Sequence, residues 1–354
     1  MKIGIVGAGA IGGLFGFRLA SAGHDVSLLA RGATLAALTR DGLRLRDGDT
    51  LHSLPVRAAD SPAALGRQDL VVVAVKAPAL PELAPTLSPM IGPESLVLSA
   101  MNGIPWWFFD GLGWLPGNGV PGDGAPRNVA QGSAEPVIDS IDPGGVLRAS
   151  FPRERTLGCV VHLSAAATGP GIVEPRMGNA LIVGEPHGTS SQRLAMLAAV
   201  LRDAGFEVET SPRIQRDVWY KLWGNMTMNP LSAITNATAD RILDDPLVRA
   251  FASRCMREAA AVGTAIGLPI DADPDERHAV TRKLGRLRTS MQNDVEARRP
   301  VELDALVGAV RDIARLAGVA TPEIDTLFGL ARLHARVLGV YPEAAATRKE
   351  SSHA

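Results

Sequence analysis

Near the amino terminus, six residues combine three glycines at a spacing suited to nucleotide phosphates. They read Gly7-Ala8-Gly9-Ala10-Ile11-Gly12, a G-x-G-x-x-G pattern. The first glycine permits a tight turn, the second lets the backbone approach a pyrophosphate, and the third lets a helix pack closely on a strand. A helix that starts here also points free amide groups and the positive end of its dipole at the phosphates. These residues therefore predict a site for a dinucleotide.

The surroundings of this turn favour a bound ligand over a bare structural turn. Lys2–Val6 is a short β-branched run typical of a buried parallel strand, Leu14–Ala22 is helical in character, and Asp25–Ala30 is a second apolar strand. Strand, glycine turn, helix and strand in about 30 residues form a βαβ unit, the setting in which this pattern binds dinucleotides.

The end of the second strand distinguishes the two nicotinamide cofactors. NAD-binding versions of the fold usually place an Asp or Glu there, to hold the ribose 2′-hydroxyl. This chain has Arg31 and no acid before Asp41. An arginine can bind a 2′-phosphate, which a carboxylate would repel. We therefore predict NADPH or NADP+ as the cofactor, with an ordinary solvated arginine as the alternative.

Two later strand ends also carry polar groups. Lys76 directly follows Leu70–Val75, and Asn102 follows Ser95–Ser99. Ligands of open α/β sheets bind beyond the carboxyl ends of the strands, so Lys76 and Asn102 are candidates for contact with the cofactor. An asparagine side chain both donates and accepts hydrogen bonds. The alternative for each is a polar loop residue in solvent.

A polar stripe runs along an otherwise apolar helical segment. Lys221, Asn225 and Asn229 recur at a spacing of four and lie on one face, among Trp and Met side chains. Burial would disfavour a charged lysine and lower its pKa, which would prepare it to donate a proton near neutral pH. The asparagines could bind an oxygen-rich substrate without adding charge. Alternatively, the lysine extends to the surface and the asparagines are helix-end residues.

These residues require two kinds of structure to position them. Strands alternate with helices in the first part of the chain, with later strands expected at Cys159–Leu163, Leu181–Val183 and Glu207–Glu209, which predicts a doubly wound, Rossmann-like parallel sheet. From Arg213 onward helical patterns dominate, and we expect an all-α second domain. The helices expected there are Gln215–Met228, Pro246–Ile266, Asp275–Ala297 and Glu302–Leu316.

The division of the chain follows from this change of character. We expect a dinucleotide-binding domain over residues 1–211, with a Gly/Pro-rich insertion at about 111–150 that forms a surface loop. A helical substrate-binding and catalytic domain would follow over 212–343, and 344–354 would be a disordered tail.

Composition excludes several classes of function. The 354 residues carry a formal net charge of −1 without a basic stripe, so we expect no nucleic-acid partner. No apolar run reaches about 18 residues and no signal peptide stands at the start, so we expect no membrane partner and a cytoplasmic location. The two cysteines, Cys159 and Cys255, are expected to be buried thiols. We predict no metal site, and leave a homodimer open.

The motifs together resemble the ketopantoate reductases (2-dehydropantoate 2-reductases), over most of the chain outside the insertion and the tail. Besides the glycine pattern, the matching motifs are Val75-Lys76, Asn102-Gly103, Lys221-Leu222-x-x-Asn225-x-x-x-Asn229-Pro230-Leu231, Ser290-Met291-x-x-Asp294 and Glu302-Leu303-Asp304 with Gly308. The resemblance implies reduction of ketopantoate to pantoate with NADPH, on the route to pantothenate and coenzyme A. It also implies a Rossmann-like domain followed by helices, as in 6-phosphogluconate dehydrogenase.

The resemblance also implies a role for each matching residue. Lys221 would be the general acid that protonates the ketone oxygen as hydride arrives, and Glu302 would tune or orient it. Asn225, Asn229 and Ser290 would hold the carboxylate and hydroxyl of a small 2-oxo acid. Asn102 and Lys76 would line the side of the nicotinamide ribose, with Asn102 also touching the substrate. From the residues alone, Ser290 is a helix residue and Glu302 a helix-start acid.

One segment departs from the family's pattern. Trp106-Trp107-Phe108-Phe109 follows Asn102-Gly103 almost directly and leads into the Gly/Pro-rich stretch. These aromatics could pack the insertion onto the domain, or they could reshape the substrate pocket. A related reductase of a bulkier or more aromatic 2-oxo acid therefore stays open. A dinucleotide-binding protein without turnover is a separate alternative, against which the set of Lys221, Asn225, Asn229, Ser290 and Glu302 argues.

Overall fold

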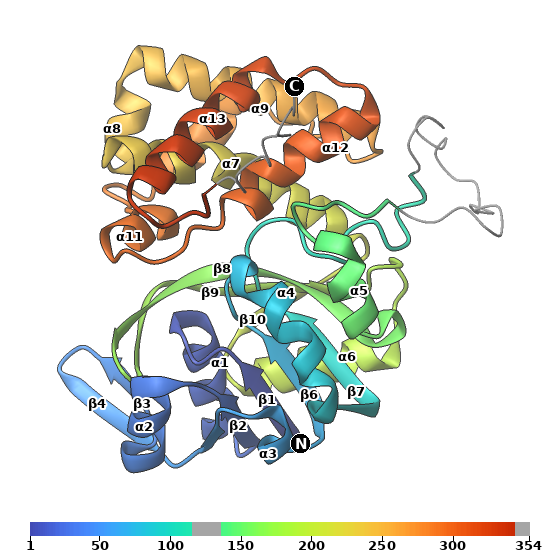
Figure 1. The fold of residues 1–354 in the computed structure, drawn as a ribbon, viewed down its shortest axis with the longest axis vertical. Coiled ribbons are helices and arrows are strands. Elements are labelled where there is room, and N and C mark those ends of the chain that lie inside the picture. The colour runs from blue at the N-terminus through green and yellow to red at the C-terminus, as the bar shows by residue number, and fades with distance from the viewer. Residues whose placement is uncertain (115–135, 344–354) are drawn as a thin grey trace, which may run out of the picture.

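The computed structural model describes residues 1–114 and 136–343. A large twisted sheet with flanking helices forms one half, and the helices from α7 (Ile214–Thr235) onward form the other, stacked on it in Figure 1. A Rossmann-like sheet followed by an all-helical part is therefore confirmed. The middle of the predicted insertion and the predicted tail lie outside the described residues.

The described residues contain ten strands in one sheet. They are β1 (Lys2–Val6), β2 (Asp25–Leu29), β3 (Leu43–Asp47), β4 (Thr50–Leu54), β5 (Arg57–Ala59), β6 (Gln68–Val73), β7 (Ile91–Ser99), β8 (Thr156–Gly169), β9 (Ile172–Gly184) and β10 (Glu207–Ser211). The seven strands expected from the sequence all occur, whereas β3, β4 and β5 were not expected. These three are short and largely polar, and they lack the apolar run that marks the central strands.

Most neighbouring strands of the sheet run parallel. Strands β5, β2, β1, β6, β7 and β8 lie side by side and run parallel, in the order of a dinucleotide-binding sheet. The predicted doubly wound parallel sheet is therefore confirmed, although β8 and β9 pair antiparallel, as do β3 and β4. The reason is local: only Pro170 and Gly171 separate β8 from β9, and so short a connection permits only a hairpin.

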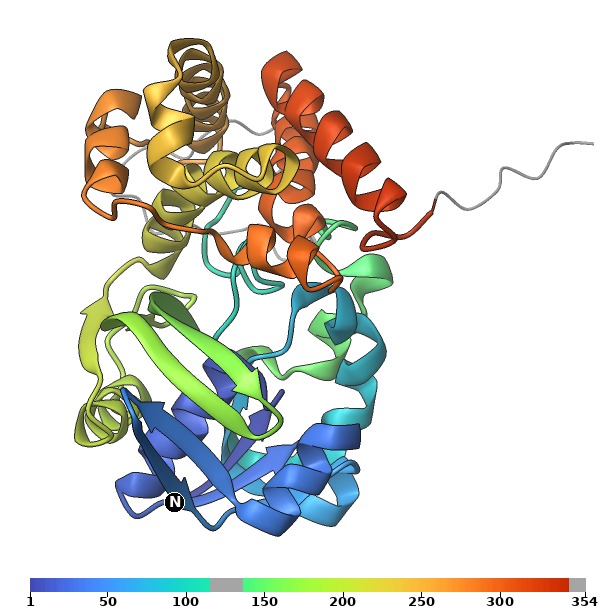
Figure 2. The ribbon, with the colours of Figure 1, turned by 90° about the vertical axis from the view of Figure 1, so that its left-hand side faces the viewer.

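The β8–β9 hairpin is longer than its neighbours and reaches over helix α1 (Ala10–Ser21). Figure 2 shows it as the long green ribbon in front of the sheet. One end of β9 pairs with β10, while the end near the hairpin turn pairs with β3. At this crossing a Cβ on Gly13 would lie 2.4 Å from a methyl of Val173, so the helix and the hairpin meet where α1 has no side chain.

The remaining helices cover the sheet or form the helical half. They are α2 (Gly32–Asp41), α3 (Pro62–Leu65), α4 (Leu80–Leu83), α5 (Val146–Ser150), α6 (Gln192–Asp203), α7 (Ile214–Thr235), α8 (Ala239–Asp244), α9 (Pro246–Ala265), α10 (Pro274–Arg282), α11 (Ser290–Glu296), α12 (Ala309–Ala317) and α13 (Pro322–Val337). None of the described helices is long and apolar enough to cross a membrane.

Three helices differ from their predicted extent. Helix α1 begins at Ala10, one turn before the predicted Leu14. Helix α7 runs through Pro230 to Thr235, where Asn236 in the left-handed region ends it. The segment expected as one helix over Asp275–Ala297 is two helices, α10 and α11. The chain turns at Gly285, with φ +63°, and the Thr289 side chain then caps α11 by accepting from the Gln292 amide at 3.2 Å.

The aromatic run after Asn102 is part of the core. Trp106, Trp107, Phe108 and Phe109 are all buried. Trp107 donates from Nε1 to the Ser99 hydroxyl at 2.7 Å, and Trp106 stacks on Phe151 with ring centres 4.6 Å apart. Of the two interpretations of this run, packing is therefore the one that the structure supports. The stretch beyond residue 136 is also no plain surface loop, because α5 lies there and buries Leu147.

Candidate active site

The glycine turn joins β1 to α1 and leaves room for a ligand at one of its three glycines. Gly7 has a φ of +101°, and a Cβ on Gly12 would lie only 1.9 Å from the Gly7 carbonyl oxygen. These two positions therefore need glycine for the fold itself. A Cβ on Gly9 would meet nothing within 4 Å, and no side chain caps the start of α1. The open space and uncapped amides fit a dinucleotide pyrophosphate.

Arg31 follows β2 and starts helix α2. Its side chain is exposed and therefore accessible to a phosphate group at the surface. β2 lies beside β1 in parallel, so Arg31 and the glycine turn share one edge of the sheet. The position fits the predicted contact with a ribose 2′-phosphate.

Lys76 and Asn102 leave the same edge of the sheet from β6 and β7. The Lys76 amine forms an ion pair with Asp294 of α11 at 2.6 Å and donates to the Pro300 carbonyl at 3.2 Å. Lys76 thus bridges the sheet and the helical half of the molecule. Its side chain keeps 35% of its surface exposed, which leaves it within reach of a ligand at this edge.

Asn102 is held in place through the glycine that follows it. Gly103 has a φ of +83°, and a Cβ there would lie 2.5 Å from the Ala305 carbonyl oxygen. The next amide, of Ile104, donates to that same oxygen at 3.0 Å. Ala305 belongs to a π-helical turn, Asp304–Gly308, a kind of turn that is frequent at functional sites. The turn therefore seats the loop that carries Asn102 on the segment that follows Glu302.

Lys221 lies on the face of α7 that points at the sheet. Its Nζ donates to Asn102 Oδ1 at 2.8 Å and to the Val161 carbonyl of β8 at 2.7 Å. An ammonium has three hydrogens, so one remains for a substrate oxygen. Burial lowers the pKa of Lys221 to about 8, although the charge of Glu302 acts against this shift. The predicted lowering of the pKa is confirmed, and the amine can exchange a proton near neutral pH.

Glu302 lies next to Lys221 and is tied to the loop after Lys76. Its Oε1 accepts from the Ala77 amide at 3.1 Å. Burial raises the pKa of the Glu302 carboxyl, while the Ala77 bond and the nearby lysines oppose the rise. Glu302 therefore acts on Lys221 through its charge, and its bond to Ala77 fixes the loop after Lys76. Cys159 is a further neighbour; burial raises its pKa to about 12, so it stays a neutral thiol. Both cysteines are free and buried, as predicted.

The structure does not bring all three residues predicted to bind the substrate together. Asn225 is half-buried and Asn229 is buried, one and two turns beyond Lys221 on α7. Ser290 is exposed and opens α11. The helices α7 and α11 pack together, through a hydrogen bond of 2.5 Å between Ser232 and Thr289. Ser290 is thus near the end of the stripe, while its side chain faces outward in this structure.

Two groups at this site could not be assigned a contact from the sequence alone. The Val161 carbonyl is a backbone atom, and no residue type could have marked it. Asp294, the partner of Lys76, stands in the motif that begins at Ser290, but the motif by itself assigns it no contact. Only the fold brings residues 76 and 294 together.

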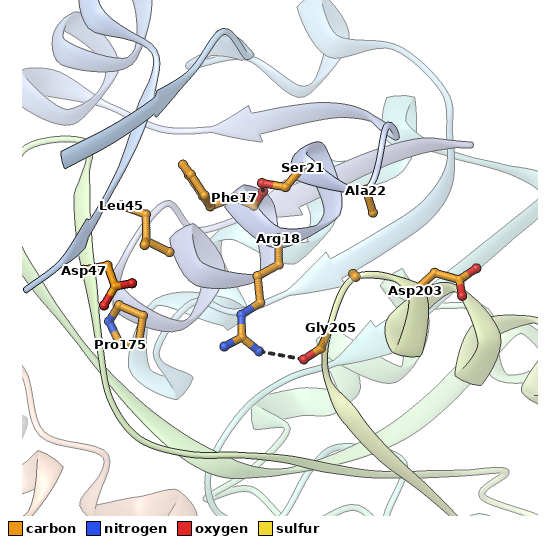
Figure 3. A pocket seen from close by; sticks show the side chains of 10 residues that line it. Phe17, Arg18, Ser21, Ala22, Leu45, Asp47, Pro175, Asp203 and Gly205 are labelled. Carbon is orange, nitrogen blue, oxygen red and sulfur yellow. Dashed lines mark hydrogen bonds between the residues drawn. The ribbon is translucent and has the colours of Figure 1, made fainter. Parts of the chain in front are cut away.

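A hollow elsewhere on the molecule is not part of this site. It has a volume of about 510 Å³ and lies at the carboxyl end of α1, opposite the glycine turn. Figure 3 shows Arg18 crossing it to donate to the Gly205 carbonyl, with Asp47 and Asp203 at its rim. It is open to solvent and lies away from the uncapped amides of the glycine turn.

Comparison with known families gives two matches on this chain. Residues 3–105 match the model described as ketopantoate reductase PanE/ApbA, and residues 213–335 match ketopantoate reductase PanE/ApbA C terminal. A 2-dehydropantoate 2-reductase of Mesorhizobium japonicum is 38% identical over 342 residues, which cover 96% of this chain and 100% of that protein. One from Nostoc sp. is 27% identical over 92% of this chain and 93% of its own.

Solved structures agree with these matches. A crystal structure from Ralstonia solanacearum MolK2, described as a ketopantoate reductase, is 52% identical, with a TM-score of 0.87 over 96% of this chain and 99% of that one. The fold is also shared with D-mandelate dehydrogenase, solved with NADH and anilino(oxo)acetate, at 21% identity and a TM-score of 0.78 over 96% of this chain and 100% of that one. The chain is an oxidoreductase that belongs to the ketopantoate reductase family.

Proposed function

We propose that this protein reduces ketopantoate to pantoate with NADPH. The observation that carries the proposal is the Lys221 amine, whose pKa is lowered to about 8 and which is held between Asn102 and the Val161 carbonyl. It lies near the edge of the sheet to which the glycine turn belongs. Membership of the family supports the same reaction. A cytoplasmic location and a homodimer stay predictions.

The groups of this chain have separate parts in the reaction. NADPH, when bound, supplies the hydride that the carbonyl carbon accepts. Negative charge then develops on the ketone oxygen, and the Lys221 ammonium stabilises it and transfers a proton to it. The product is an alcohol and the lysine is left as a neutral amine, to be protonated again from solvent. Asn102 and the Val161 carbonyl hold the amine in place throughout.

The remaining predicted residues bind rather than react. The glycine turn and α1 would hold the pyrophosphate, and Arg31 the 2′-phosphate that distinguishes NADPH from NADH. Asn225 and Asn229 offer amide groups for the hydroxyl and carboxylate oxygens of the substrate. Ser290 joins them if its side chain turns inward from the start of α11.

A related reductase of a larger 2-oxo acid is the second candidate. The fold that this chain shares with D-mandelate dehydrogenase supports it. The aromatic run Trp106–Phe109 no longer does, because all four side chains are buried in the core. A binding protein without turnover is the third, and the depressed pKa of Lys221 speaks against it.

A panel of 2-oxo acids tests this proposal. The purified protein is mixed with NADPH and, in turn, ketopantoate, 2-oxoisovalerate and phenylglyoxylate, and the loss of NADPH absorbance is followed. We expect the highest kcat/KM with ketopantoate, and a lower value with NADH in place of NADPH. Faster turnover of phenylglyoxylate would favour the second candidate, and no turnover of any acid would contradict the reaction.

A further inference from the structure

Helix α10 places an arginine against the catalytic helix. Arg277 lies over the ring of Tyr220, with its Cζ 5.4 Å from the ring centre. A Cβ on Gly224 would lie 2.9 Å from both Nε and Nη2 of the guanidinium, so this seat exists only because residue 224 is a glycine. Gly224 directly precedes Asn225, and Tyr220 directly precedes Lys221. The guanidinium therefore lies alongside the polar stripe, one ridge away on α7.

Arg277 has no acidic partner among the residues that the structure describes. Its Nε is buried without an acceptor, and Tyr220 is the one group whose charge acts on it to raise its pKa. Burial lowers the pKa of the guanidinium. Arg282, five residues further on the same helix, differs, because it pairs with Asp244 at 2.5 Å. A partly buried cation without a counter-charge is unfavourable, unless a ligand brings the anion.

The charge of Arg277 also acts on a residue of the sheet, His162. His162 follows Val161 in β8, and Val161 is the residue whose carbonyl holds Lys221. Partial burial of the imidazole, together with the charges of Lys221 and Arg277, lowers the pKa of His162 to about 4. His162 is thus neutral at physiological pH and provides no charge for an anion. Lys221 and Arg277, both from the helical half, are the cations whose charges act on His162.

We propose that Arg277 binds the carboxylate of the 2-oxo acid and makes the site select acids over neutral ketones. The inference rests on the proposed reduction of a 2-oxo acid. The carboxylate of such an acid is bonded to the ketone carbon, so it needs a cation close to the proton donor. The planar fork of an arginine matches a carboxylate with two parallel hydrogen bonds, which the asparagines cannot offer. Asn225 and Asn229 then add neutral hydrogen bonds to the hydroxyl and carboxylate oxygens.

The test compares Arg277→Gln with a matched change on the same helix, Arg282→Gln. Each variant is assayed with the best acid of the panel and with the methyl ester of that acid. We expect Arg277→Gln to raise KM for the acid roughly 10- to 100-fold, as expected for a lost charged hydrogen bond, with little change in kcat. KM for the ester should be the same as in the unaltered enzyme. Arg282→Gln should change neither.

Folding is checked separately through NADPH affinity and the thermal midpoint. If Arg277→Gln does not fold, Arg277→Lys replaces it as the test, because it keeps the positive charge. It should raise KM for the acid by a smaller factor and leave KM for the ester unchanged. Equal effects on acid and ester, or no effect on either, would overturn the role of Arg277 while the proposed reaction stands. If the unaltered enzyme reduces no acid of the panel, both proposals fail.

Discussion

The phosphate turn and the surroundings of Lys221 are built in different ways. The turn is made by six consecutive residues and uses backbone amides and missing side chains. The hydrogen bonds around Lys221 and Glu302 join residues 60, 119 and 225 positions apart in the chain. The first region depends on local geometry, whereas the second exists only when the helical half is seated on the sheet. A change in one should therefore leave the function of the other measurable.

The largest effect is expected at Lys221. Lys221→Ala removes the proton donor, and we expect kcat to fall roughly 10²- to 10⁴-fold, the usual contribution of a general acid. NADPH affinity should stay close to that of the unaltered enzyme, because the glycine turn is untouched. Lys283→Ala, at an exposed lysine after α10, is the control and should keep full activity. Near-normal turnover in Lys221→Ala would show that another group protonates the ketone.

Changes in the glycine turn should affect stability or NADPH binding instead of proton transfer. The effects should differ between the second glycine, Gly9, and the third, Gly12. A Cβ on Gly12 collides with the Gly7 carbonyl, so Gly12→Ala should lower the thermal midpoint by disturbing packing worth about 1–3 kcal/mol. A Cβ on Gly9 enters open space, so Gly9→Ala should keep the thermal midpoint of the unliganded protein.

The same Gly9→Ala variant should bind NADPH about tenfold or more weakly, because the added methyl group stands where the pyrophosphate approaches. Thermal unfolding without ligand and titration with NADPH separate the two effects. Unchanged NADPH affinity in Gly9→Ala would mean that the phosphates do not approach this position.

These two regions also differ in how far they could be predicted from the sequence. The turn, its strand and its helix form a local pattern; the predicted strands match β1 and β2 closely, while α1 starts one turn before the predicted helix. The polar stripe on α7 could likewise be predicted, because helical spacing fixes which residues share a face. Three contacts could not be predicted, because each joins segments that are distant in the sequence. They are the bond of Lys221 to the Val161 carbonyl, the pairing of Lys76 with Asp294 and the packing of Arg277 on Gly224.

A smaller effect is expected at Arg31, which tests the choice of cofactor. Arg31→Glu should weaken NADPH binding roughly tenfold or more, since it replaces a partner of the 2′-phosphate with a like charge. NADH binding should change much less. Arg40→Glu, on the same helix and likewise exposed, serves as the control for general charge effects. Equal weakening of both cofactors by Arg31→Glu would remove the basis for preferring NADPH.

The pH dependence of the reduction tests most directly whether the buried amine of Lys221 is the proton donor. The donor must be protonated, and its pKa lies near 8. At saturating NADPH, kcat/KM for ketopantoate should therefore be level below this pH and fall about tenfold per pH unit above it. The residual activity of Lys221→Ala should lack this fall. A profile of the unaltered enzyme that stays level up to the ordinary pKa of a lysine, or that rises with pH, would contradict the assignment.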